Sequence, residues 1–317
     1  MFKPLVRATL AASLLVLVAA CDKQADNGAT PAVTASPSSP DAAILASIKL
    51  LKQGDINGLM QNALPPAEFA KAKADWAKDK DEQPITDEDR AKFNETMTKL
   101  TAPDAEQKLF AEIEPKLKEF DATYQQQIPM YASMGSTVVK NMIQQNQSLS
   151  EAERTQAGAA VDALVAWVQN TRFTEPESIK KVIAIVSKSA RDMNLKSLDE
   201  ARALDYDQSM AKARIAFAGI KDALGVYGFS LDQTLDSVQA KVVSNDGKNA
   251  TVQLHYTLLG APLDATAEMV NVDGRWYGKQ MMEKLKEKAA AAGASDAVTA
   301  PAPAAPAPAA AQAPPKG

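Results

Sequence analysis

Apolar positions between residues 41 and 236 recur at helical spacing, and a break separates each apolar stretch from the next. Ile44, Ile48 and Leu51 fall on one helical face after Ser39 and Pro40, a capping residue followed by proline. Comparable faces carry Phe93, Met97 and Leu100; Leu109, Ile113, Leu117, Phe120 and Tyr124; Val161, Leu164, Val165 and Val168; Ile179, Val182, Ile183 and Val186. Residues 41–236 are therefore predicted to form a helical body, and they show no fixed internal period.

Helix starts are predicted where a hydroxyl side chain precedes an acid by three residues, because the acid can then reach back to the amide of the capping residue. Three pairs have this spacing, with a weaker fourth: Ser148 and Glu151, Thr174 and Glu177, Ser197 and Glu200, and Thr86 and Asp89. Pro129 lies inside an apolar pattern that resumes at Tyr131, so a kink or a break is expected there.

The period of the pattern changes to two near residue 237. In residues 249–259, Val252, Leu254, Tyr256 and Leu258 alternate with polar positions that include His255. Residues 238–243 and 263–272 give two more strands; a break is expected at 260–262, and Trp276 begins a fourth strand. Between the last two strands, residues 273–274 are Asp-Gly, the dipeptide typical of a two-residue hairpin turn.

These patterns predict an α+β fold, in which a mainly helical body precedes a small C-terminal antiparallel β-meander with one exposed face. A closing helix from Gln280 to about Ala291 follows the meander. The expected organisation is a signal peptide (1–20), a lipidated cysteine with a flexible tether (21–40), the helical body (41–236), the meander with its closing helix (237–291) and a disordered Ala/Pro tail (292–317).

The N-terminus has the pattern of a secretory signal peptide. Lys3 and Arg7 precede an apolar stretch too short to cross a membrane, and small residues lead to Cys21, the one cysteine of the chain. Residues 18–21, Val-Ala-Ala-Cys, resemble the lipobox of bacterial lipoproteins, which implies cleavage before Cys21 and acylation of its thiol. An uncleaved anchor and an ordinary signal with a chance cysteine are the alternatives. Asp22 resembles an inner-membrane retention signal, so the periplasmic face of the inner membrane is favoured over the outer membrane.

The two terminal segments have compositions that do not build a core. Residues 22–40 are expected to form a random-coil tether that spans about 25 Å. Residues 299–317 are rich in Pro and Ala and are expected to favour polyproline II, reaching about 50 Å when extended. The tail is interpreted either as a spacer or as a terminus without a role.

Charge excludes one class of partner. After signal cleavage 33 of the 35 basic residues remain against 39 acidic ones, whereas nucleic-acid-binding proteins carry a concentrated basic surface. No nucleic-acid partner is therefore expected, and a broad electrostatic contact with anionic lipid is disfavoured.

The chain offers few groups for catalysis, so no enzyme activity, catalytic residue, cofactor or metal is predicted. His255, the one histidine, is interpreted as a strand residue on the polar face. One histidine and no free thiol exclude the common zinc sets. Acids at 79–82 and 87–89 lack the spacing of a calcium loop and are interpreted as a solvated helix end. A carboxylate-dependent hydrolase remains a lesser alternative.

Residues 124–147 combine glutamines with an apolar stripe that contains Met130, Met134 and Met142. Methionine is adaptable and suits promiscuous binding surfaces, so one interpretation is an apolar groove for a lipid or a partner helix. Ordinary packing between helices is the favoured interpretation.

Residues 269–276, MVNVDGRW, resemble the closing hairpin of small NTF2-like lipoprotein domains, which often reads V-x-x-D-G-x-W. In that family helices pack into a cone on a curved sheet, so the resemblance implies a pocket for a small apolar ligand or lipid. Two functions follow as hypotheses. The first is a non-catalytic envelope lipoprotein, anchored through Cys21, that binds or helps assemble a protein partner. The second is a module that binds a small apolar ligand.

Overall fold

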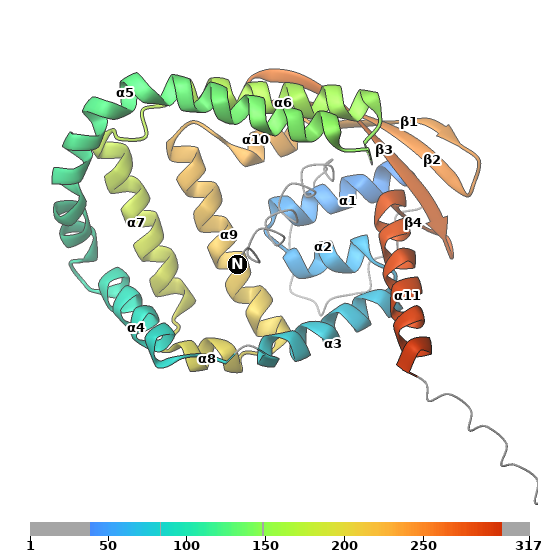
Figure 1. Cartoon of the computed structure of the whole chain (residues 1–317), viewed down its shortest axis with the longest axis horizontal. Helices are drawn as coiled ribbons and strands as arrows, with labels where there is room; N and C mark the ends of the chain where they lie inside the picture. The colour runs from blue at the N-terminus through green and yellow to red at the C-terminus, as the bar shows by residue number, and fades with distance from the viewer. Residues whose placement is uncertain (1–38, 83, 148, 300–317) are drawn as a thin grey trace, which may run out of the picture. The chain divides into compact units, whose positions relative to one another are not determined.

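A computed structural model describes residues 39–82, 84–147 and 149–299 and confirms the α+β class (Figure 1). The chain divides into two compact units, Met1–Gly278 and Lys279–Gly317. The described part of the first unit contains these helices: α1 (Pro40–Lys52), α2 (Ile56–Ala63), α3 (Pro66–Glu82), α4 (Asp87–Thr101), α5 (Ala105–Gln145), α6 (Glu151–Asn170), α7 (Pro176–Met193), α8 (Leu198–Ala203), α9 (Tyr206–Val226) and α10 (Leu231–Asp236). Its strands are β1 (Gln239–Asn245), β2 (Asn249–Leu258), β3 (Ala261–Val272) and β4 (Arg275–Gly278).

Three of the five predicted caps, Ser39, Thr86 and Ser197, cap helices at the predicted positions. Ser39 caps α1, and Thr86 with Asp89 makes a complete capping box at α4, stronger than predicted. At α8, Ser197 caps the helix as predicted, but the Glu200 carboxylate accepts from the Lys196 amide instead of the amide of Ser197.

Two predicted caps are displaced along the chain. Helix α6 is capped by Ser150, which forms a box with Glu153, while Ser148 lies outside the described residues. The cap of α7 is Glu175 instead of Thr174. Thr174 is buried, and its hydroxyl donates to Asp121 of α5. A tertiary partner therefore takes the side chain that local spacing had assigned to capping.

Of the kink or break predicted at Pro129, the break is absent. Helix α5 runs for 41 residues through both Pro115 and Pro129, and Figure 1 shows it curving along its length. A proline removes one backbone hydrogen bond of a helix and favours a bend. Because α5 packs against α4, α7 and α6, neighbouring helices support the chain on both sides of the bend.

The four strands form one antiparallel sheet in the order β1-β2-β3-β4. Both hairpins after β2 and β3 close through two residues with positive φ, Leu259 with Gly260 and Asp273 with Gly274. The predicted Asp-Gly turn is therefore confirmed. The predicted break at 260–262 is shorter than expected, because Ala261 and Pro262 already pair with β2.

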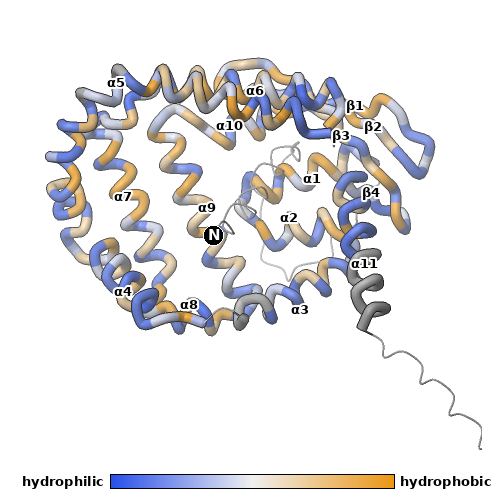
Figure 2. The backbone as a smooth tube through the Cα atoms, viewed as in Figure 1, coloured by the Kyte–Doolittle hydropathy of each residue, from blue (hydrophilic) through white to orange (hydrophobic). Residues whose placement is uncertain are grey.

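The main core lies between the sheet and the first two helices. Ile44 and Ile48 of α1 and Leu235 of α10 pack with Val252 and Leu254 of β2, and each is at most 3% exposed. A second cluster joins Ala163 of α6 to Leu258 and Leu263 at the β2–β3 hairpin. Figure 2 shows hydrophobic positions recurring along α1, α7 and α9, whereas α4 is largely hydrophilic and buries no side chain.

The second unit contains α11 (Lys279–Thr299). The closing helix is therefore present, and it continues beyond its predicted end near Ala291. Residues 1–38, which include Cys21 and nearly all of the predicted tether, lie outside the described residues, as do residues 300–317 of the predicted tail. In the described ranges no helix has both the length and the apolar character needed to span a bilayer.

Candidate functional site

The C-terminal half of α5 displays a row of large apolar side chains on its surface. Met130, Tyr131, Met134, Val138 and Met142 have between 53% and 66% of their surface exposed; we call this row the α5 stripe. Four of the five residues are spaced by four, which places them along one side of a helix. The favoured sequence interpretation, in which this segment packs in the interior, is therefore wrong for these side chains.

The stripe is exposed because the opposite side of α5 already has its neighbour. The side chains of Ile128, Ala132 and Ile143 are partly buried. Helix α5 packs against α6, and the contacts of Lys140 with Asp162 and of Gln169 with the Pro129 carbonyl lie in this C-terminal half of α5. Helix α6 in turn packs on the β2–β3 hairpin through Ala163. Helix α5 is thus the outer member of this stack.

The segment around the stripe is almost free of charge. Residues 122–149 contain one charged side chain, Lys140, although 23% of the whole chain is charged. The Lys140 ammonium lies 2.5 Å from the carboxylate of Asp162 on α6. The remaining polar groups are amides and hydroxyls, among them Gln127, Ser133, Thr137, Asn141, Gln144 and Gln145. Apart from Lys140, the polarity of this segment therefore comes from neutral groups.

An aromatic cluster holds α5 near its middle. The Tyr124 ring contacts Phe173, which contacts Trp167 and Tyr227 at centroid distances of 5.2 and 4.9 Å. The Trp167 indole donates to the Tyr227 carbonyl, and the Tyr227 hydroxyl donates to the carbonyl of Phe173. Burial raises the pKa of both Tyr124 and Tyr227. This cluster ties α5 to α6 and α9 and supports the exposed half of α5.

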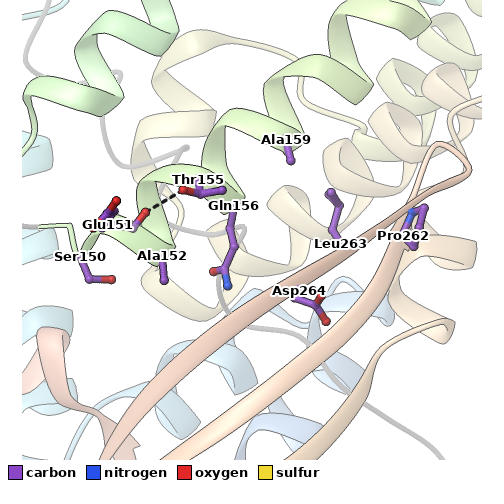
Figure 3. A pocket seen from close by; sticks show the side chains of 9 residues that line it. All are labelled: Ser150, Glu151, Ala152, Thr155, Gln156, Ala159, Pro262, Leu263 and Asp264. Atoms are coloured by element: carbon purple, nitrogen blue, oxygen red, sulfur yellow. Dashed lines mark hydrogen bonds between the residues drawn. The ribbon is translucent and has the colours of Figure 1, made fainter.

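A groove of about 800 Å³ lies between the first turns of α6 and the start of β3 (Figure 3). It is lined by Ser150, Glu151, Ala152, Thr155, Gln156, Ala159, Pro262, Leu263 and Asp264. Two polar groups of the groove make hydrogen bonds within α6. The Ser150 hydroxyl caps the helix, and the Thr155 hydroxyl donates to the Glu151 carbonyl. Its apolar wall comes from Leu263, Pro262 and Ala159.

His255 lies on the exposed face of the sheet, as predicted. It faces Asp264 across the β2–β3 pair, and its Nδ1 is 2.8 Å from the Asp264 carboxylate. A serine- or cysteine-type site would also place a hydroxyl or thiol at the other ring nitrogen. Among the described residues, Asp264 is the side chain that contacts the imidazole ring. The side chains of His255 and Asp264 are both more than half exposed. The pair therefore has the geometry of a cross-strand surface contact.

The acids that resembled a cation site lie at helix ends. Asp87 pairs with Arg90, and Glu88 pairs with Lys92. Asp89 accepts from the Thr86 hydroxyl and amide, and these hydrogen bonds lower the pKa of its carboxyl. The side chains of residues 79–82 are not among those described. Within the described ranges, no cluster of three His, Cys, Asp or Glu side chains forms a metal site.

The apolar stripe of residues 124–147 can be recognised in the sequence, but the favoured interpretation places its side chains in the interior. The overlooked signal is the lack of charge: polar positions of a surface helix are commonly charged, whereas here they are amides and hydroxyls. Comparison with known proteins adds no assignment, because no protein-family model, no curated protein and no solved structure matches this chain.

Proposed function

We propose that this chain is a non-catalytic lipoprotein of the bacterial cell envelope that binds a protein partner through the α5 stripe. Cys21 carries the lipid, and the body faces the periplasm, at the inner membrane in preference to the outer. The observation that carries the proposal is the exposure of five large apolar side chains on one helix face, within a segment whose one charged side chain, Lys140, pairs with Asp162.

The composition of the stripe favours a protein over a bilayer. Tyrosine and methionine are enriched in protein interfaces, and contiguous exposed apolar surface on a soluble domain marks an interaction site. Helices that lie on membranes usually add lysine or arginine for anionic lipid, whereas the one cation of this segment, Lys140, pairs with Asp162.

The proposed anchor brings the body close to its partner. A tether of this length spans about 25 Å, so the body stays near the membrane surface and meets other envelope proteins at a high effective concentration. Cys21→Ala should prevent acylation and release the chain from membranes. Continued sedimentation of this variant with membranes would contradict the anchor.

The binding proposal is tested by placing a photo-crosslinking amino acid at Met134 in the intact chain in cells. The matched control carries the same group at Lys181, an exposed position on α7. We expect a discrete protein adduct from position 134 and none from position 181. Met142→Glu, combined with the crosslinker at 134, should reduce the adduct at least about tenfold, because a buried unpaired carboxylate is costly. An equal adduct from both positions would contradict a specific site.

A second candidate function rests on the groove between α6 and β3. Its volume lies within the range of small-ligand sites, and it has an apolar wall beside two carboxylates, Glu151 and Asp264. A small apolar molecule that co-purifies with the chain and is lost from Leu263→Gln, but retained by Met134→Gln, would support this alternative. The same loss from both variants would count against it.

A further inference from the structure

We infer that the protein seated on the α5 stripe is a second copy of this chain, packed stripe to stripe about a two-fold axis. The inference rests on the proposed function, since it names the occupant of the same surface. The interface is self-complementary, and the same face of α5 in each copy forms it.

The charge pattern of the segment favours a second copy as the occupant. A two-fold interface brings the same patch of each copy together, so a charged group that lies near the axis faces its own kind. Amide and hydroxyl groups do not have this conflict, because each both donates and accepts hydrogen bonds. Residues 122–149 are polar through such groups, and Lys140 is held by Asp162. This segment offers a partner of complementary charge no charged group beyond the paired Lys140, whereas a second copy matches its neutral polar groups.

The shape of the helix surface also favours close packing by a second copy of α5. Met130, Met134, Val138 and Met142 form a ridge at spacing four, the type of ridge that packs into the matching groove of another helix. Gly135 lies beside this ridge, and a β-carbon built on it would meet no atom within 4 Å. Glycine weakens a helix interior, and nothing in the described part of this chain crowds this position. A helix from a second copy, which approaches closely at Gly135, gives the glycine a packing role.

Disulfide trapping in cells tests the geometry on the intact lipoprotein. Cysteine is placed singly at Met134 or Val138, and as controls at Lys181 on α7 or Asn245 on β1, both exposed. The unmodified chain reports any crosslink through Cys21. We expect covalent dimers of this chain from positions 134 and 138 under mild oxidation, and at least about tenfold less from the two controls. Equal yields at all four positions would overturn the inference.

A charge pair then tests self-recognition. Met134→Lys alone should reduce trapping through V138C at least about tenfold, and so should Met134→Glu alone, because each places like charges together. Both variants expressed in one cell should restore a mixed dimer, since a lysine then meets a glutamate. Failure of the mixture to restore trapping, while each single variant remains folded by circular dichroism, would overturn the inference.

Glycine substitutions separate packing from helix stability. Gly135→Ala should reduce the yield of dimer, while Gly158→Ala on α6, where a β-carbon also meets no atom within 4 Å, should not. Both changes remove a helical glycine, so an effect common to both would count against close packing at Gly135.

The outcomes distinguish this inference from the proposed function. A photo-adduct from position 134 that contains a different protein, without a dimer of this chain, would overturn the inference and leave the proposed function standing. Binding of the purified chain to neutral lipid vesicles, lost in Met134→Glu and without a dimer or adduct, would overturn both.

Discussion

The ammonium of Lys140 on α5 lies 2.5 Å from the carboxylate of Asp162 on α6. This ion pair holds the one charged side chain of residues 122–149 against the neighbouring helix. The outer face of the C-terminal half of α5 is consequently left with methionine, valine and tyrosine among neutral polar groups. The arrangement separates the contact that positions α5 within the chain from the surface that we assign to a second copy.

Loss of this ion pair should have little effect on stability. Both side chains are more than a third exposed, and exposed pairs contribute at most about 1 kcal/mol. Lys140→Ala should therefore lower the free energy of unfolding by less than about 1 kcal/mol in urea denaturation, while dimer trapping through V138C persists. A loss of trapping as complete as in Met134→Glu would show that the charge itself belongs to the interface.

Truncation in the core should contrast with truncation on the stripe. Leu258 is 1% exposed and joins the sheet to α6, so Leu258→Ala should cost about 2–5 kcal/mol. Met134 is 60% exposed, and Met134→Ala should change the unfolding free energy of the monomer by less than about 0.5 kcal/mol. Urea denaturation at low protein concentration measures both. Similar losses would mean that Met134 is buried within its own chain.

The sheet could be predicted well because its signals are local. The alternation around Val252 fixes which face is buried, and an Asp-Gly pair fixes the turn at residue 273. The start of α7 could not be predicted in the same way. Thr174 has the spacing of a cap, yet Asp121, 53 residues away, takes its hydroxyl and leaves the cap to Glu175. Spacing along the chain carries no information about such a tertiary partner.

The candidate site shows the same limit. Periodicity correctly identified an apolar stripe through Met134, but it cannot tell whether such a stripe faces the interior or the solvent. The neighbour on the opposite side of α5 decides this, and that neighbour is α6. The low charge of residues 122–149 can be read directly from the sequence. This low charge distinguishes the C-terminal half of α5 from a typical surface helix.

The contact between Asp121 and Thr174 should stabilise the junction of α5 with α7. The Asp121 carboxylate accepts from the buried Thr174 hydroxyl and lies 2.5 Å from the Arg172 guanidinium. Asp121→Ala should cost about 1–3 kcal/mol, because the hydroxyl loses its acceptor inside the protein. Thr174→Val in the same background should recover part of the loss, since it removes the stranded group. Urea denaturation of the two single variants and the double variant measures the coupling; strictly additive losses would contradict it.

Tyr256 should make the sheet sensitive to alkaline pH. Burial raises the pKa of its phenol above the ordinary value of 10.0, and the nearby Asp264 carboxylate raises it further. Below about pH 10 the phenol is neutral in both the folded and the unfolded chain, so the full stability is present. As the pH rises above this value the unfolded chain loses the proton first, which favours unfolding until the pH passes the folded pKa. The free energy of unfolding should therefore fall above about pH 10, and Tyr256→Phe should fall less steeply than the parent chain. Tyr131→Phe, a change of the same kind on the exposed stripe, is the matched control. If the Tyr256→Phe and parent curves remain parallel between pH 8 and 11, burial of Tyr256 is not what couples the sheet to pH.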